Sequence, residues 1–429
     1  MNFTRRDFLA TAALSSASVA LGSRGDAQMP KMQMDEPKPE RPTVPRLPAI
    51  ICKVTGTIGI DAAYKMLVAG RDTLDAALHI CQTQEDDPND HSAGLGGLPN
   101  QEGEVQLDAC CLHGPTRRGA AVAGVSGIRN PSLLARAVME HSGYSVLAGS
   151  DAQRFAITQG FSKEDLMTER ARNNWILWKH IKSSPELLGT GIYDPNWPGQ
   201  AAKAHFLPES QKDLDMLVHK LEPMAAQAGI GPALTWRGVY DALFPAAEAL
   251  YVSTVNQKNE VSSATTTSGL PWRLPGAISD VAVIGAGSYL DPEIGSAGST
   301  GNAEANIRTA GAHTIVENMR TGMSPEEAGM DALRRIAGWY KNDMTALRFV
   351  EMVYYILRKD GAYASVSLWH GDKTGHKRMF EIKDGDGMRR TEECAFLFEG
   401  NPPNGTSVSH SSMAASPTHS SPANSTHVL

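Results

Sequence analysis

Apolar residues recur along this chain at two different spacings, which predict helices and strands mixed in one domain. Residues 73–81 carry apolar positions at the i, i+3, i+4, i+7 interval of a helix with one buried face: Leu74, Ala77, Leu78 and Cys81. Asp72 precedes this run as an N-cap. Asn130 before Pro131 predicts a second helix that ends near Gly143. Ser324 and Glu327 form the capping box of a third.

Strands are predicted as two hairpins. Residues 352–357 and 362–368 are joined by a turn containing Asp360-Gly361, which supplies the positive φ that a tight hairpin needs. A second pair covers residues 249–255 and 260–267. Antiparallel hairpins beside amphipathic helices predict an α+β layered domain rather than a parallel βαβ repeat.

The first residues are typical of an export signal. Arg5 and Arg6 form a twin-arginine pair before an apolar stretch, residues 8–21, that is too short for a stable membrane span. A small residue, Ala27, ends a cleavage site. We therefore expect residues 1–27 to be removed, with periplasmic or secreted mature protein and no membrane anchor after removal.

Two further segments are expected to lie outside the folded domain. Residues 28–48 are rich in proline with Met, Lys and Glu, a composition typical of an extended linker. Residues 401–429 consist largely of Ser, Thr, Pro, His and Asn and predict a disordered tail. The domain is therefore predicted to cover residues 49–400.

Charge and cysteine content exclude several classes of function. The formal net charge of -7 is mild for 429 residues, and no basic run with interleaved aromatics occurs, so a nucleic-acid partner is not expected. Five cysteines at scattered spacings fit neither a disulfide framework nor a zinc site. Small molecules or proteins are the expected partners.

No cofactor or metal is expected either. Residues 283–287 resemble the start of a dinucleotide fingerprint, but the third glycine is absent and Asp291-Pro292 follows where the phosphate-binding helix should begin. The acidic run 85–91 lacks the ligand spacing of a calcium loop. Both stretches are interpreted as turns or solvated helix ends.

The most specific pattern is a glycine-rich stretch, residues 92–103, followed by the strand 105–109 that contains Leu107-Asp108-Ala109. These motifs in this order resemble those of the glycosylasparaginase family. The likeness continues through residues 128–131, 135–141, 264–269, 285–287, 298–301, 316–319 and 356–361, and so covers nearly all of residues 49–399. The resemblance implies the four-layer αββα sandwich of the N-terminal-nucleophile hydrolases, no cofactor, and a homodimer.

The same resemblance implies a self-cutting amidohydrolase whose threonine attacks the β-amide of an asparagine derivative, with its freed α-amine as base. That threonine stands eighteen residues before the third threonine of the run that ends at Thr267. Here the position is Ala249. The family's two chains would correspond to residues 49–248 and 249–400, but an alanine methyl can neither cut the chain nor form an ester.

Other family positions are partly kept. Thr267 matches a threonine that supports the nucleophile, and Thr300 and Gly301 match the oxyanion-hole pair, although Ala303 replaces a glycine. Ala277 replaces the arginine that holds the substrate carboxylate, whereas Asp280 matches the partner of its amine. Each of the kept residues also fits a structural role in a turn or strand end.

Three hypotheses follow. The first is an exported family member whose chemistry has decayed and which binds an amino-acid-like ligand or a partner. The second is a working asparaginase or glycosylasparaginase with Ser253 or Thr254 as nucleophile, but a shift of four residues moves the nucleophile by more than about 10 Å along the strand. The third is a surface or assembly protein without catalysis.

Overall fold

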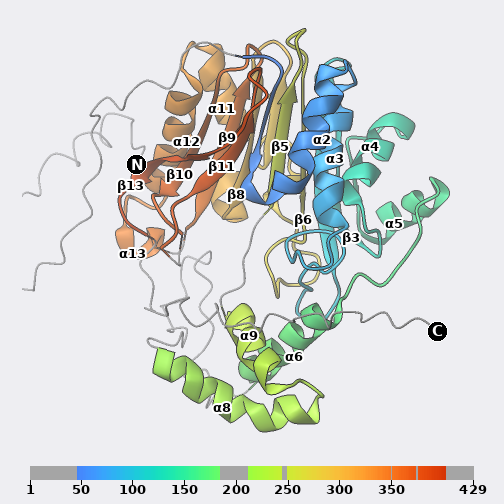
Figure 1. Cartoon of the computed structure of the whole chain (residues 1–429), viewed down its shortest axis with the longest axis vertical. Coiled ribbons are helices and arrows are strands. Elements are labelled where there is room, and N and C mark those ends of the chain that lie inside the picture. The colour runs from blue at the N-terminus through green and yellow to red at the C-terminus, as the bar shows by residue number, and fades with distance from the viewer. Residues whose placement is uncertain (1–45, 184–210, 244–248, 349, 373–374, 402–429) are drawn as a thin grey trace, which may run out of the picture. The chain divides into compact units, whose positions relative to one another are not determined.

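The larger of two sheets has eight strands and places β5 near its middle (Figure 1). This computed structural model describes residues 46–183, 211–243, 249–348, 350–372 and 375–401. The spatial order is β12 (Arg389–Glu393), β11 (Met379–Lys383), β1 (Ala49–Lys53), β5 (Leu250–Val255), β6 (Val261–Thr267), β2 (Gln106–His113), β3 (Arg118–Ser126) and β4 (Val146–Ala148). All neighbours are antiparallel except β3 and β4.

The second sheet has five strands. Their order is β13 (Ala395–Phe398), β10 (Tyr363–Trp369), β9 (Met352–Arg358), β8 (Gly295–Gly301) and β7 (Ser288–Asp291). Only the β13–β10 pair is parallel. Both predicted hairpins, β5–β6 and β9–β10, are confirmed.

Helices pack on both sheets, and a further group of helices packs together around a core of its own. The described helices are α2 (Thr57–Val68), α3 (Thr73–Glu85), α4 (Pro131–His141), α5 (Gly149–Thr158), α6 (Glu169–Ser183), α8 (Gln211–Gln227), α9 (Pro232–Leu243), α10 (Ala303–Thr309), α11 (Gly311–Arg320), α12 (Pro325–Trp339) and α13 (Met344–Leu347), with short 3-10 turns at Val54–Gly56 and Asp280–Ala282. Helices α6, α8 and α9 share a small apolar core of their own.

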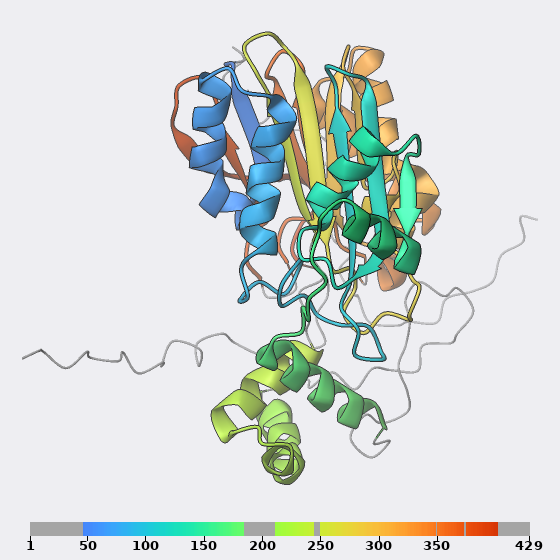
Figure 2. The same ribbon diagram turned by 90° about the vertical axis from the view of Figure 1, so that its right-hand side faces the viewer.

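The alternation of side chains along single strands shows four layers. In β9, Tyr354 and Ile356 pack into a core with α11 and α12, whereas Tyr355 and Leu357 point into a core shared with the first sheet. In β1, Ile50 faces the core with α2 to α5. Figure 2 shows these blue and teal helices over the first sheet. The predicted αββα architecture is therefore confirmed.

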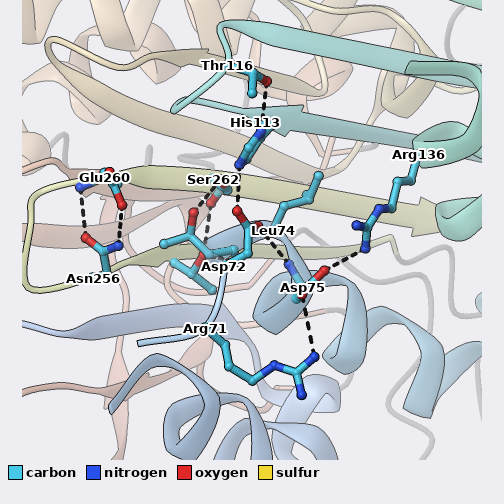
Figure 3. Close-up of polar contacts among 12 residues, drawn as sticks. Arg71, Asp72, Leu74, Asp75, His113, Thr116, Arg136, Asn256, Glu260 and Ser262 are labelled. Atoms are coloured by element: carbon cyan, nitrogen blue, oxygen red, sulfur yellow. Dashed lines mark hydrogen bonds and ion pairs between the residues drawn. The ribbon is translucent and has the colours of Figure 1, made fainter. Parts of the chain in front are cut away.

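Local signals place the helix ends as predicted, with one difference. Asp72 Oδ1 accepts the main-chain N–H groups of Leu74 and Asp75, while Oδ2 lies 2.9 Å from His113 Nε2 (Figure 3). The α12 capping box is present in full. Asn130 makes no side-chain cap, because its amide instead reaches Asp86 Oδ1 at 3.0 Å.

The predicted signal segment, most of the linker and residues 402–429 of the tail lie outside the described residues. Among the helices that the structure describes, none combines the length and apolar character needed to cross a membrane.

Candidate active site

Ala249 stands at the head of the central strand β5, where the resemblance places the nucleophile. It is 8% exposed, and its main-chain N–H donates a 2.9 Å hydrogen bond to Thr300 Oγ1. Leu250 pairs with Thr266, so Ala249 and Thr267 lie at the same end of the β5–β6 ladder. Two of the predicted site residues thus meet directly, and a third lies at the same sheet end.

Thr267 has a local structural partner. Its Oγ1 accepts the N–H of Gly269 at 2.9 Å, which closes a turn after β6. Its side chain is buried, and its strand partner across the ladder is Asp108. The hydroxyl therefore shapes the loop that leaves the site.

The glycine at position 301 is required by the backbone. Gly301 has φ of +127°, and a Cβ there would come within 2.2 Å of the Glu351 carbonyl oxygen. Thr300, one residue earlier on β8, presents its hydroxyl to Ala249. This pair keeps the position that the resemblance assigns to an oxyanion hole, but the Thr300 hydroxyl accepts a main-chain N–H.

Asp280 points into the protein. One carboxylate oxygen, Oδ2, accepts hydrogen bonds from Ser299 Oγ at 2.8 Å and Asn306 Nδ2 at 2.6 Å. Asn306 Oδ1 in turn accepts the hydroxyl of Tyr354 at 2.6 Å. Burial raises the pKa of Asp280, and the hydrogen bonds from Asn306 and Ser299 oppose that rise. Ser299 and Asn306 were not expected from the sequence.

The loop after β6 carries a buried arginine, although Ala277 itself is on an exposed turn. Arg273 donates to Asp108 Oδ2 at 2.6 Å and to the Gln106 carbonyl at 2.7 Å. Ser279 N–H donates to the same Asp108 oxygen at 3.0 Å. The Arg273 guanidinium therefore anchors this loop to strand β2. A charged Asp108 between apolar strand neighbours was the sequence signal for such a partner.

Ser253 and Thr254 are both fully buried within β5. The Ser253 hydroxyl contacts Ser296 Oγ, and the Thr254 hydroxyl donates to the Thr73 carbonyl at 2.8 Å. Both residues also pair with β1 and β6 in the sheet. Neither stands at a strand end where a shifted nucleophile would have to be.

No three His, Cys, Asp or Glu side chains converge to hold a metal ion in the part of the chain that the structure describes. A surface groove of about 340 Å³ lies elsewhere, and the residues that line it include Glu102, Lys163 and Arg172. The groove contains none of the predicted site residues, so it does not lie at the candidate active site.

The αββα layer order, with Ala249 at the head of β5 beside Thr300, is the arrangement of the N-terminal-nucleophile amidohydrolases. The family model described as asparaginase matches residues 55–206 and 246–348, and on this evidence the chain belongs to the asparaginase family. It is 30% identical over 374 residues to N(4)-(β-N-acetylglucosaminyl)-L-asparaginase of Elizabethkingia miricola, covering 86% of this chain and 91% of that protein. The enzyme of the same name from Mus musculus is 28% identical, covering 66% and 75%.

Proposed function

We propose that this chain is an exported asparaginase-family protein that has lost the amidohydrolase reaction, stays uncut, and binds an amino-acid-like ligand or a protein partner. The observation that supports the proposal best is Ala249 at the head of β5, hydrogen-bonded to Thr300 through its main-chain nitrogen. A methyl group has no lone pair with which to attack a carbonyl carbon. Without a cut, the nitrogen of residue 249 stays an amide and cannot act as a base.

Substrate binding is weakened separately. Ala277 lacks the bidentate donors that an arginine offers to a carboxylate, a contact worth about 1.5–3 kcal/mol. One oxygen of Asp280 is already occupied by Ser299 and Asn306. A retained fold without the nucleophile supports a binding role rather than catalysis, and we extend the proposal to a homodimer, which the family resemblance implies.

Intact-mass spectrometry of the purified mature protein tests the central claim. We expect one chain that releases no ammonia from asparagine or glycosylasparagine. Two chains, with the second beginning at Ser253 or Thr254, would support the working-enzyme alternative and overturn the proposal. So would turnover of asparagine at about 1 per second or faster.

Export is proposed from the sequence of residues 4–9. Replacing Arg5 and Arg6 with lysine keeps the charge but removes the twin-arginine signal. We expect the precursor to accumulate inside the cell, as judged by fractionation and immunoblotting. Unchanged export of this variant would refute the twin-arginine route without affecting the proposal about catalysis.

A further inference from the structure

The surface groove of about 340 Å³ has the size of a small-molecule site, since such sites usually measure about 300–1,000 Å³. We call it the Glu102 groove; it is lined by residues 102–105, 126–127, 163–167 and 172. Part of this lining is apolar, because it includes the buried side chains of Val105 and Leu166 and the half-buried Met167. The groove can therefore hold a short aliphatic chain.

Two glycines fix the backbone of the Glu102 groove. Gly103 has φ of +85°, and a Cβ there would come within 2.9 Å of the Trp175 ring. Gly127 has φ of +70°, and its carbonyl oxygen accepts the N–H of Glu164 at 3.0 Å. Residues with a side chain rarely adopt such a backbone conformation. The groove is therefore built into the backbone and is more than a gap between surface side chains.

The loop that carries Glu102 and Glu104 is held from inside by Asn100, which is 1% exposed. Asn100 Oδ1 accepts the main-chain N–H groups of Glu102 at 2.9 Å and of Glu104 at 3.1 Å. The main-chain N–H of Asn100 donates to the Glu104 carbonyl oxygen at 2.9 Å. These three hydrogen bonds give both acidic residues a fixed backbone at the edge of the groove.

Four other charged residues in or beside the groove form two ion pairs. Arg129 Nε lies 3.2 Å from Glu164 Oε1, and the same guanidinium also contacts the second carboxylate oxygen. Arg172 Nη2 lies 3.6 Å from Asp165 Oδ2. Each pair balances its own charge, so these four residues leave the groove without a net charge.

Three charges of the groove have no such balance. The side chains of Glu102, Glu104 and Lys163 are exposed, and none of them has a hydrogen bond or an ion pair with another residue in the part of the chain that the structure describes. At pH 7 the two glutamates are negative and the lysine is positive. The groove therefore presents two negative charges and one positive charge beside an apolar surface.

We propose that the Glu102 groove binds a free basic amino acid, such as lysine or ornithine. This ligand carries an α-ammonium group, a second cation at the end of its side chain and one carboxylate, so its charges complement those of the groove. Its methylene chain would cover the apolar lining around Leu166. The proposal goes beyond the proposed function, because the groove contains no residue of the candidate active site.

Saturation-transfer NMR of the mature protein at low ionic strength tests this with three probes. L-Lysine is the ligand, L-norleucine keeps its stem but lacks the terminal ammonium, and Nα-acetyl-L-lysine amide keeps the side chain but blocks both α-charges. We expect lysine to bind at least about fivefold more tightly than either of the others, and to bind more weakly as salt is added. Equal affinity for norleucine would overturn the proposal. So would equal affinity for the blocked lysine, which represents a lysine within a protein partner.

Substitutions locate the binding in the groove. Glu102→Gln combined with Glu104→Gln should weaken lysine binding at least about fivefold, whereas Glu326→Gln at the start of α12 is the matched control and should not. Lys163→Gln should weaken binding through the ligand carboxylate, and Lys258→Gln in the β5–β6 turn is its control. Unchanged lysine affinity in either groove variant would overturn the proposal, as would equal losses in the controls.

Discussion

The main-chain nitrogen of Ala249 lies 2.9 Å from the hydroxyl oxygen of Thr300. This hydrogen bond joins the head of β5 in one sheet to the end of β8 in the other. Because the nitrogen belongs to a peptide bond, it donates and the Thr300 hydroxyl accepts. This hydrogen bond therefore connects the two sheets at the head of β5.

Replacing Thr300 with valine should destabilise the protein. The change keeps the shape but leaves the buried N–H of Ala249 without its acceptor, which costs about 1–3 kcal/mol of unfolding free energy. Thr300→Ser, which keeps the hydroxyl, should lose less. Urea unfolding gives the unfolding free energy of both variants, provided that its slope against urea concentration is unchanged. Equal stability of the valine variant and the parent would mean that another group satisfies this N–H.

The buried Arg273–Asp108 pair should matter far more than an exposed pair. Arg273→Met leaves the fully buried Asp108 carboxylate without its cation, a change that costs about 3–5 kcal/mol. Arg117→Ala, which breaks the exposed pair with Glu293, is the control and should leave the unfolding midpoint nearly unchanged.

The double variant Arg273→Met with Asp108→Asn should recover part of the loss, because no buried charge is then left unpaired. Chemical unfolding of the parent, Arg273→Met, Arg117→Ala and the double variant gives the free energies to compare. If the double variant is as unstable as Arg273→Met alone, the loss comes from packing of the arginine stem.

Glu85 should make stability depend on pH. Its carboxyl is fully buried and accepts from the N–H and hydroxyl of Ser132, and burial raises its pKa from 4.5 to about 7. Between these two values the folded protein holds a proton that the unfolded chain has lost, so the stability from Glu85 falls as pH rises through about 7. This shift in the pKa of Glu85 corresponds to about 3 kcal/mol of unfolding free energy.

Glu85→Gln provides the test, because an amide offers Ser132 both an acceptor and a donor and does not titrate. The difference in unfolding free energy between the variant and the parent should grow in favour of the variant from about pH 5 to pH 8. A difference that stays constant over this range would show that Glu85 keeps one protonation state.

The sequence predicted the helices and hairpins of the α+β domain well, because they depend on local signals. Asp72 and the apolar spacing of residues 74–81 define α3, and the Asp360-Gly361 turn defines the β9–β10 hairpin. The family likeness then ordered these pieces into two sheets. The single elements could therefore be predicted from their own patterns, whereas their four-layer order came from the family resemblance.

The polar contacts of the site could not be predicted in the same way. Asp280 could be placed near Ala249 by motif, but its carboxylate faces Ser299 and Asn306, which are 19 and 26 residues away in sequence. Arg273 and Asp108 are 165 residues apart. Which acceptor a side chain finds depends on packing between distant segments, and the sequence signal for it was only that a buried charge needs a partner.

Restoring the hydroxyl at position 249 should not restore the enzyme. Ala249→Thr puts a nucleophile beside Thr300, but Ala277 still offers no bidentate partner for a substrate carboxylate. We expect no ammonia release from asparagine by this variant, and Ala249→Val, which has the same shape without the hydroxyl, is its control. Two chains on a denaturing gel from the threonine variant alone would show that the cutting geometry survives.

Ala249→Thr combined with Ala277→Arg addresses both losses together. Because turnover needs both a nucleophile and a bound substrate carboxylate, neither change should suffice alone: any ammonia or aspartate release should appear in the double variant and in neither single one. Ala277→Lys in the same background keeps a charge but not the planar fork of arginine, and should give less product. If Ala249→Thr alone turns over asparagine at about 1 per second, the proposed second loss at position 277 is wrong, and the proposed inactivity rests on the side chain at position 249 alone.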